Sequence, residues 1–211
     1  MSPRAIKNFK PLKDMQVLID TMLPFSEQGF SRPHKKFYFK THGVDVIYLI
    51  LEGTIFLHRV SDGMVVASGH APLLIGLTND TLMGDSVYYF TAGTDISYTV
   101  LPLLTAMNII KENKLWQSYS NLQSYLLKFL SANGAEIAAL SAYEIICNQL
   151  RNLMQESDDI RLKITASTYI QERTRLSRSR IMNILSQLKS GEYIMTSNGM
   201  LTSINKLPEK F

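Results

Sequence analysis

The stretch RTRLSRSRIMNILSQL, residues 173–188, decides how the C-terminal quarter of this chain folds. Four arginines fall within its first eight positions, and an apolar pattern follows them. Ser177 stands just ahead of that pattern and is of the residue type that caps a helix N-terminus. The i, i+3, i+4 and i+7 positions, which form one buried stripe of a helix, are held by Ile181, Ile184, Leu185 and Leu188. The stretch therefore predicts a capped helix that begins among arginines.

The segments around this helix predict a larger motif. Thr165 can cap a shorter helix over residues 166–172, about five residues upstream, which makes a helix-turn-helix. Gly191 stands where a left-handed residue would end the second helix. Two β-rich runs follow, joined by Asn198-Gly199, the strongest two-residue hairpin signal. Helix, turn, helix and hairpin in this order predict a winged helix-turn-helix.

The charge distribution favours contact with a polyanion. Net charge is +4, but residues 161–211 hold nine Lys/Arg against three Asp/Glu, whereas residues 60–110 hold four Asp and no Lys or Arg. No carboxylate occurs between Glu172 and Glu192. A solvated helix face usually mixes Glu with Lys, while phosphate contact requires cations without anions. For Arg173 a simple solvated position remains the alternative.

Residues 35–101 are short β-branched or aromatic runs separated by Gly and Asp, with Asp62-Gly63 as a hairpin signal. Seven runs are predicted as strands: 35–41, 46–53, 54–60, 64–69, 72–77, 86–93 and 96–101. Strands at this spacing indicate a sandwich, barrel or jelly roll. Ahead of them, a helix after Pro11 is predicted by the spacing of Leu12, Met15, Leu18 and Met22.

From about residue 103 the apolar periodicity is helical. A heptad seam, with alternating steps of four and three, is formed by Leu115, Tyr119, Leu122, Leu126 and Phe129. The seam predicts packing either on the chain's own β-domain or on a second copy, and Trp116, Leu127 and Leu130 widen the stripe enough for both. Asn133-Gly134 predicts a break.

Beyond that break, Ser141 and Glu144 form a capping box that opens a helix through about Gln155. Residues 156–163 are predicted as a polar connector. We therefore expect an α+β chain with three parts: a helix and β-domain at 1–105, a long helix at 106–140 and a winged helix-turn-helix at 141–211.

Composition is ordinary for a globular protein, with 45% hydrophobic and 19% charged residues. No apolar run reaches the roughly 18 residues of a membrane span. The first residues, MSPRAIKNFKPLKDMQ, contain no apolar core of a secretory signal. We therefore expect a cytoplasmic protein without a membrane segment.

Several segments resemble one superfamily. ITASTYIQERTRLSRSRIMNILSQLKSGEYI (164–194) is similar to the DNA-binding end of the Crp/Fnr-like regulators, whose second helix opens Ser-Arg-x-x-Val/Ile. YLILEGTIFLHRVSDGMVVA (48–67) resembles their β-roll, and residues 95–113 resemble the passage into their dimerisation helix. The resemblance spans about residues 35–205. YIQERTRLSRS (169–179), GEYI (191–194) and the tail 201–211 resemble most the enterobacterial IprA-type branch, the inhibitors of hydrogen peroxide resistance.

This resemblance implies an antiparallel β-roll of the cyclic-nucleotide-binding type, a long dimerisation helix and a winged helix-turn-helix. It further implies a cytoplasmic homodimer that regulates transcription on a near-palindromic site in double-stranded DNA. RNA polymerase is a further candidate partner. A link to peroxide resistance is the function that the closer branch suggests.

The resemblance also assigns roles to residues of the second helix. Ser177 and Arg180 would touch phosphate. Arg178, Ser179 and Asn183 would face base edges, with Arg178 suited to guanine. Ser179 stands where many members have Glu and Asn183 where Arg is common, so the superfamily's best-known operator is not expected to apply. The remaining DNA-binding candidates, expected to act at the DNA backbone or the helix start, are Thr165, Arg173 and Arg175.

Cyclic-nucleotide binding is not expected. In members that bind these ligands, a Gly-Glu-Leu turn holds the ribose and a downstream arginine holds the phosphate. Here the matching turn, IGLTND (75–80), keeps Gly76 without the Glu, and residues 81–93 contain no arginine. A buried phosphodiester without a cation carries a penalty of several kcal/mol.

No other cofactor and no catalytic cluster is expected, so the chain is not predicted to be an enzyme. His34, His42, His58 and His70 lack metal-ligand spacing, and a single cysteine rules out a multi-cysteine site. Cys147 is interpreted as a small core residue. The alternative function is a redox or small-molecule sensor, acting through Cys147 with Arg151 at i+4 or through a β-roll pocket.

Overall fold

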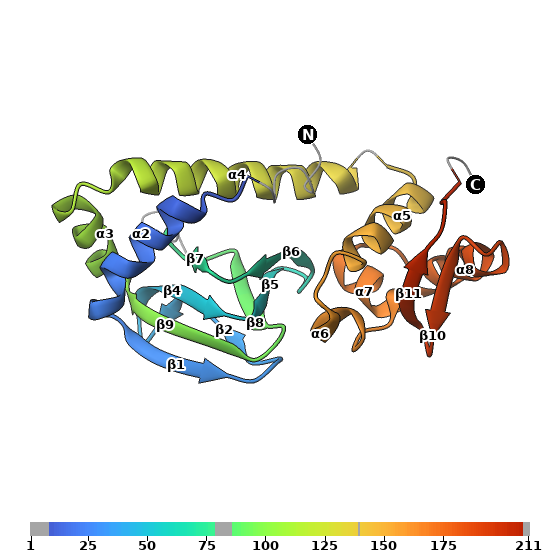
Figure 1. Cartoon of the computed structure of the whole chain (residues 1–211), viewed down its shortest axis with the longest axis horizontal. Coiled ribbons are helices and arrows are strands. Elements are labelled where there is room, and N and C mark those ends of the chain that lie inside the picture. The colour runs from blue at the N-terminus through green and yellow to red at the C-terminus, as the bar shows by residue number, and fades with distance from the viewer. Residues whose placement is uncertain (1–8, 79–85, 139, 209–211) are drawn as a thin grey trace. The chain divides into compact units, whose positions relative to one another are not determined.

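The computed structural model describes residues 9–78, 86–138 and 140–208, with the side chains of 132–138 left aside (Figure 1). Contacts divide the chain into two compact units, residues 1–133 and 134–211, and each is described by itself. In the part of the chain that is described, no helix is long and apolar enough to span a membrane.

The N-terminal unit begins with helix α2 (Leu12–Met22) and the 3-10 turn η1 (Leu23–Phe25). The helix predicted after Pro11 is confirmed, and its buried stripe contains Met15, Leu18 and Met22. Leu12 lies outside that stripe and is exposed. α2 therefore contributes its apolar face to the core of the β-domain.

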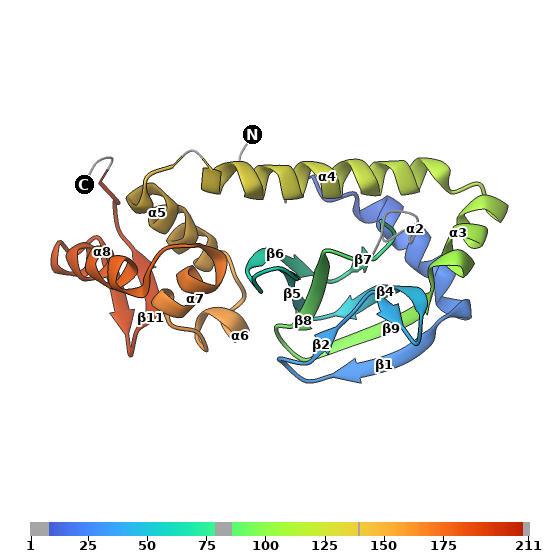
Figure 2. The same cartoon turned by 180° about the vertical axis from the view of Figure 1, so that it is seen from behind.

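Nine described strands follow, in two antiparallel sheets (Figures 1 and 2). One sheet has the order β1-β9-β4-β3, with β7 paired to β4, and the other has the order β2-β8-β5-β6. The strand bounds are β1 (Glu27–Ser31), β2 (Lys36–Phe37), β3 (Lys40–Thr41), β4 (Val44–Glu52), β5 (Thr54–Arg59), β6 (Val65–His70), β7 (Leu73–Ile75), β8 (Tyr88–Ala92) and β9 (Ile96–Pro102).

The sheets confirm the predicted antiparallel domain but differ from the expected strands in two places. β1 was not predicted, because Glu27–Ser31 is short and mostly exposed; it pairs through its backbone with β9, where Gly29 lies opposite Tyr98. The predicted run 35–41 is divided into β2 and β3, which belong to different sheets. Asp62-Gly63 lies in the β5–β6 hairpin as predicted, with Asp62 paired to Arg59 at 2.6 Å.

The inner faces of the two sheets pack through aromatic rings. Phe37 and Phe90, cross-strand partners in one sheet, stack with ring centroids 4.7 Å apart, and Tyr48 of the other sheet meets Phe90 edge-on at 5.0 Å. Such arrangements are the preferred geometries of buried aromatic pairs. Helix α3 (Leu103–Glu112) follows β9 and buries Ala106, Ile109 and Ile110 in the same core.

Helix α4 (Trp116–Ala138) carries the predicted heptad seam apart from Leu115, which directly precedes it, and that seam faces the chain's own β-domain. Leu122 is fully buried and Phe129 nearly so, and the other seam residues pack against the same core. Asp14 of α2 accepts hydrogen bonds from Ser118 Oγ at 2.8 Å and Asn121 Nδ2 at 3.0 Å, which ties α4 to α2. Of the two alternatives, the packing on its own domain accounts for the seam.

The break predicted at Asn133-Gly134 is wrong, because α4 continues through both residues to Ala138. One glycine costs a helix only about 1 kcal/mol relative to alanine. The following residues, AEIA (135–138), include two alanines, the strongest helix formers, and one glutamate. The helix therefore crosses the boundary between the two units.

The C-terminal unit contains four helices and one hairpin among its described residues. Their bounds are α5 (Ala142–Leu153), α6 (Asp158–Arg161), α7 (Ala166–Arg173), α8 (Arg178–Ser190), β10 (Ile194–Ser197) and β11 (Met200–Ile204). The Ser141–Glu144 capping box is confirmed, with both reciprocal hydrogen bonds present. The predicted polar connector instead contains α6, whose Ile160 is buried.

Gly191 follows α8 directly, but the expectation that it adopts a left-handed conformation is wrong. Its φ is −83°, and the left-handed residue is Glu192 with a φ of 57°. Glycine is needed at 191 for a different reason: a Cβ there would lie 2.4 Å from the ring of Tyr193. The close approach of that ring therefore selects the glycine.

Candidate nucleic-acid interface

Helix α8 separates an apolar face from a polar one, as the sequence predicted. Ile181 and Leu188 are fully buried in the core of the C-terminal unit, and Ile184 and Leu185 are packed against it. The opposite face is exposed along its length and consists of Arg178, Ser179, Met182, Asn183 and Ser186. This 13-residue helix thus presents an exposed surface that is polar except for Met182 and has cations at its N-terminal end.

Ser177 is confirmed as the N-cap of α8. Its Oγ accepts the backbone N–H of Arg180 at 3.3 Å and lies 3.2 Å from Ser179 Oγ. The first amides of a helix and its dipole favour an anion at this end. The cap therefore supports an arrangement that attracts phosphate.

Arg178 and Arg180 are exposed, and neither forms an ion pair with any residue that the structure describes. Arg175, also exposed, lies in the turn 174–177 between α7 and α8. Charged groups of one sign on an exposed face are attractive to the phosphates of DNA and cost little to maintain in water. The structure places these three arginines at the start of α8.

Asn183 is oriented by a residue that the sequence interpretation missed. Gln187 Nε2 donates to Asn183 Oδ1 at 2.8 Å, one helical turn away. The Asn183 amide keeps its two N–H donors and one oxygen lone pair for a base edge. The i, i+4 spacing of an Asn and a Gln on an exposed helix face is a signal that could have identified this pair.

Thr165 caps α7, as predicted, and also lies against the hairpin. Its Oγ1 accepts the backbone N–H of Thr168 at 3.2 Å. The backbone N–H of Ala166 donates to the carbonyl of Gly199 at 2.9 Å. Asn198 and Gly199 both have positive φ, the geometry of a type I′ hairpin turn. The tip of the hairpin and the start of α7 are therefore held together.

Arg173 differs from the other DNA-contact candidates of α8 and its preceding turn in being buried. It is the last residue of α7, not a turn residue, and is only 5% exposed. Its guanidinium lies 3.7 Å from the centre of the Tyr169 ring, and the Tyr169 hydroxyl donates to Glu156 at 2.9 Å. Neither a solvated position nor a phosphate contact fits this burial, so Arg173 is part of the core.

Cys147 is buried on α5, only 3% exposed, in agreement with its interpretation as a core residue. Burial raises the pKa of its thiol, while the Tyr143 hydroxyl and Arg151 oppose that shift in part. Because the thiolate is the form that reacts with peroxide, this environment disfavours reaction.

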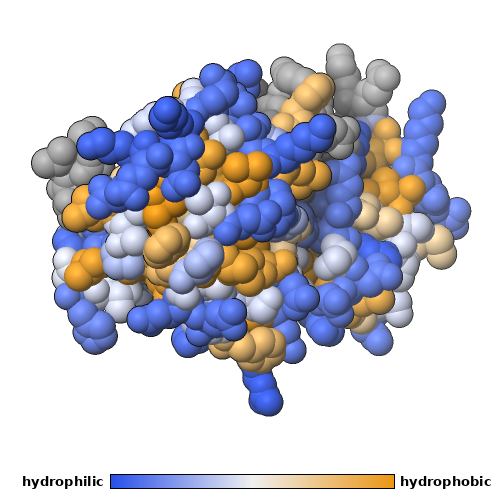
Figure 3. Space-filling view, turned by 60° about the vertical axis from the view of Figure 1, so that its left-hand side comes forward, coloured by the Kyte–Doolittle hydropathy of each residue, from blue (hydrophilic) through white to orange (hydrophobic). Residues whose placement is uncertain are grey.

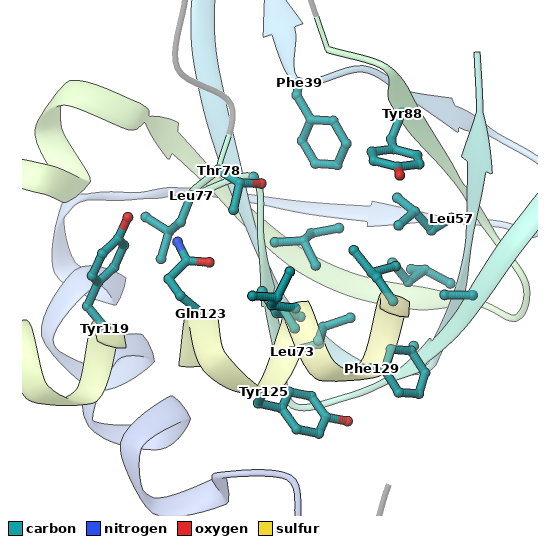
Figure 4. A pocket seen from close by; sticks show the side chains of 18 of the residues that line it. Phe39, Leu57, Leu73, Leu77, Thr78, Tyr88, Tyr119, Gln123, Tyr125 and Phe129 are labelled. Atoms are coloured by element: carbon teal, nitrogen blue, oxygen red, sulfur yellow. The ribbon is translucent and has the colours of Figure 1, made fainter. Parts of the chain in front are cut away.

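A cavity of about 1190 Å³ lies within the N-terminal unit (Figure 4). Phe39, Leu57 and Tyr88 line it on the side of the sheets, and Tyr119 and Gln123 line it from α4. Gly76 and Thr78 of the turn compared with cyclic-nucleotide sites also line it. Residues 79–85, which include Asp80 of that turn, lie outside the described residues. Among those described, no cluster of His, Cys, Asp or Glu could hold a metal ion.

The expectation about cations missed one residue of this cavity. Residues 60–110 contain no Lys or Arg, but Lys10, from the segment ahead of α2, lines the cavity. Its Nζ donates to the carbonyl oxygen of His70 at 2.6 Å. Burial lowers the pKa of Lys10 to about 8. Nothing in the local sequence marks Lys10, since the contact joins residues 60 positions apart.

Comparison with known proteins agrees with this geometry. A family model described as winged helix-turn-helix DNA binding matches residues 142–209. The inhibitor of hydrogen peroxide resistance of Escherichia coli K12 is 27% identical over 164 residues, which cover 78% of this chain and 79% of the relative. Its counterpart from Salmonella typhimurium LT2 has the same identity and coverage.

Solved structures of low identity share the fold. The c-di-GMP responsive global regulator CLP of Xanthomonas campestris has a TM-score of 0.74 at 12% identity, over 91% of this chain and all of that one. A transcriptional regulator of the Crp/Fnr family from Eubacterium rectale has a TM-score of 0.67 at 15% identity, over 94% and 95% of the two chains. The chain therefore has the fold of the Crp/Fnr-like regulators, its residues 142–209 match a winged helix-turn-helix DNA-binding family, and its sequence is similar to that of the inhibitors of hydrogen peroxide resistance.

Proposed function

We propose that this protein is a homodimeric regulator of transcription that reads a near-palindromic operator through α8. The observation that carries the proposal is the exposed start of α8, where Arg178 and Arg180 stand without ion pairs among the described residues. Two such helices would enter successive major grooves roughly 34 Å apart. We expect the regulator to act in the cytoplasm, with RNA polymerase as a candidate partner.

Contacts divide into those that position the protein and those that read bases. Ser177, Arg175 and Arg180 would contact phosphate and supply affinity that falls with salt. Arg178 would donate to the O6 and N7 atoms of guanine. Asn183, held by Gln187, would read adenine or a bridging water. Ser179 is too short to reach a cytosine as a glutamate would, so the operator differs from one read by glutamate.

The test of this register is selection of binding sites from random DNA, followed by affinity measurements on the selected operator. Arg178→Ala is expected to relax preference at one base pair in each half-site, at a cost of about 1–3 kcal/mol. Lys189→Ala, an exposed cation in the last turn of α8, is the matched control. Unchanged base preference in Arg178→Ala would show that another residue reads that base pair.

The second copy would bind at the flank of α4 that the β-domain leaves uncovered. Trp116 and Leu127 of α4 are exposed, 47% and 69%, and Leu130 lies on the same side. Exposed apolar side chains recur on the N-terminal unit, and Figure 3 shows apolar patches among polar residues on one side of the molecule. Leu127→Asp would place a charge in this interface and is expected to yield monomers in sedimentation. Lys128→Asp, the exposed neighbour, should leave the dimer intact.

Cyclic nucleotides are not the ligands of the β-domain in this proposal. Gly76 is followed by Leu77 where those sites have a glutamate, and Lys10 is the one Lys or Arg among the described residues that line a cavity with mostly apolar walls. Titration with cyclic AMP and with c-di-GMP should leave the melting temperature and the operator affinity unchanged. Stabilisation by either nucleotide would contradict this point.

The link to peroxide resistance rests on the homologues named above and is a proposal for this chain. The alternative is a redox sensor acting through Cys147. We expect the buried thiol to stay reduced after mild peroxide treatment, by mass spectrometry, and operator affinity to be equal in the wild type and in Cys147→Ser. Loss of operator binding on oxidation in the wild type alone would favour the sensor.

A further inference from the structure

The cavity of the N-terminal unit combines apolar walls with the ammonium group of Lys10. Its walls are mostly apolar, formed by side chains of both sheets and of α3 and α4. They include Phe39, Ile55, Leu57, Leu73, Leu77 and Phe129. A space of about 1190 Å³ with such walls is of the size and polarity that bind small organic molecules.

One ammonium group enters this apolar space. Lys10 reaches it from the segment ahead of α2, and its Nζ donates to a main-chain carbonyl, that of His70. A carbonyl is a neutral acceptor and leaves the charge of the ammonium uncompensated. The other titratable side chains of the walls are Asp45, His70, Tyr88, Tyr119 and Tyr125. None of them contributes to the lowered pKa of Lys10, which has burial as its cause.

We propose that the cavity binds an apolar monocarboxylic acid, whose carboxylate pairs with Lys10 and whose hydrocarbon body fills the space between the sheets and α4. A monoanion matches the single ammonium, and the carboxylate can accept two of its three N–H donors beside the bond to His70. The hydrocarbon body gains from each apolar wall that it touches.

The site also suggests how the ligand would regulate the protein, and this part rests on the proposed function. Leu127 and Leu130 of α4 line the cavity and also belong to the flank proposed for the second copy. An acid that packs against these residues would change the free energy of dimerisation, and hence the operator affinity.

The direct test is calorimetric titration of the full chain with decanoate and with decanol, which share the hydrocarbon and differ in the carboxylate. At pH 7 we expect decanoate to bind about tenfold or more tightly than decanol. Lys10→Met should reduce decanoate to the affinity of decanol. Lys13→Met, an exposed lysine of α2, should change neither.

Two further measurements distinguish binding in this cavity from non-specific binding of the ligands elsewhere on the protein. Ala67→Phe, which fills part of the cavity from β6, should weaken both ligands alike, with the melting temperature as the check on folding. Raising the pH above about 8 should weaken decanoate and leave decanol unchanged, because the ammonium is lost. Equal decanoate binding by the wild type and Lys10→Met, or no binding at all, would overturn the inference.

Operator binding is measured on the same preparations with and without decanoate. If the protein binds its operator but not decanoate, the inferred ligand site is wrong and the proposed function stands. If the protein binds decanoate through Lys10 but does not bind DNA, the inferred ligand site stands and the proposed function is wrong. Operator affinity that is unchanged by bound decanoate would overturn the regulatory part.

Discussion

Cations in the two units of this protein can stand in opposite environments, as the arginines at the start of α8 and Lys10 show. In the C-terminal unit, Arg178 and Arg180 at the start of α8 are exposed, in a segment (173–191) whose sequence contains no carboxylate. In the N-terminal unit, Lys10 is turned into an apolar cavity, where its charge is costly. Position, more than residue type, decides what a cation does: on the surface it attracts phosphate, and inside it titrates, pairs or stabilises a core.

The largest effect that would sharpen this comparison is expected at Arg173, the buried arginine of the C-terminal unit. Arg173→Ala removes the cation over the Tyr169 ring and leaves the buried Glu156 side chain with an altered environment. Loss of one member of a buried charged cluster typically costs about 3–5 kcal/mol. Denaturant unfolding measures this loss, and Arg175→Ala, exposed two residues away, should change stability little.

A smaller effect is expected at Lys10. Its pKa in the folded protein is about 8, below the ordinary 10.5, so the unfolded chain binds more protons between these values. The free energy of unfolding should therefore rise between pH 8 and pH 10.5, by about 1–2 kcal/mol because part of the side chain reaches solvent. Lys10→Met should be more stable than the wild type at pH 7 and should lack this rise. If the free energy of unfolding depends on pH in the same way in the wild type and in Lys10→Met, Lys10 is not the group responsible.

The cap of α8 is expected to show a comparable loss without any cation. Ser177→Ala removes the acceptor of the Arg180 N–H and should cost about 1 kcal/mol of stability. Operator affinity should fall as well, because the same hydroxyl lies at the proposed phosphate contact. Ser177→Asp restores the cap but adds a negative charge, so stability should recover while DNA affinity does not.

The smallest effect is expected at Arg180 on the exposed face. Arg180→Ala should weaken binding to all DNA about equally and reduce the slope of log affinity against log salt by about one. Stability should change by less than about 0.5 kcal/mol, as for most surface substitutions. Fluorescence anisotropy at several salt concentrations, with the selected operator and a scrambled duplex, separates this from a loss of specificity.

Local sequence patterns predicted the elements that depend on local chemistry. The caps Ser141, Thr165 and Ser177 and the Asn198-Gly199 turn are each fixed by side-chain to backbone bonds or backbone conformation within a few residues. The buried stripe of α8 follows from helical periodicity in the same way. These are the elements that make up the winged helix-turn-helix.

What the sequence could not show depends on contacts between distant residues. β1 exists because β9 offers a pairing edge, not because Glu27–Ser31 has an apolar pattern. Arg173 is buried against the ring of Tyr169, whose hydroxyl donates to Glu156, although Arg175, Arg178 and Arg180 nearby in sequence are exposed. Lys10 enters a cavity whose walls come from strands and helices far along the chain. Each of these outcomes is decided by tertiary packing.

The backbone hydrogen bond from Ala166 to Gly199 affects any attempt to exchange DNA specificity between regulators. The hairpin tip rests on Thr165, so a Cβ at position 199 would lie 3.2 Å from the Thr165 methyl group. Asn183 is similarly dependent on Gln187 for its orientation. A graft of residues 178–183 alone would transfer the proposed base-contacting side chains without the residues that orient them. A transferred segment would therefore have to include Thr165, Gln187 and Gly199, together with the core contacts that α5 makes with α7 and α8.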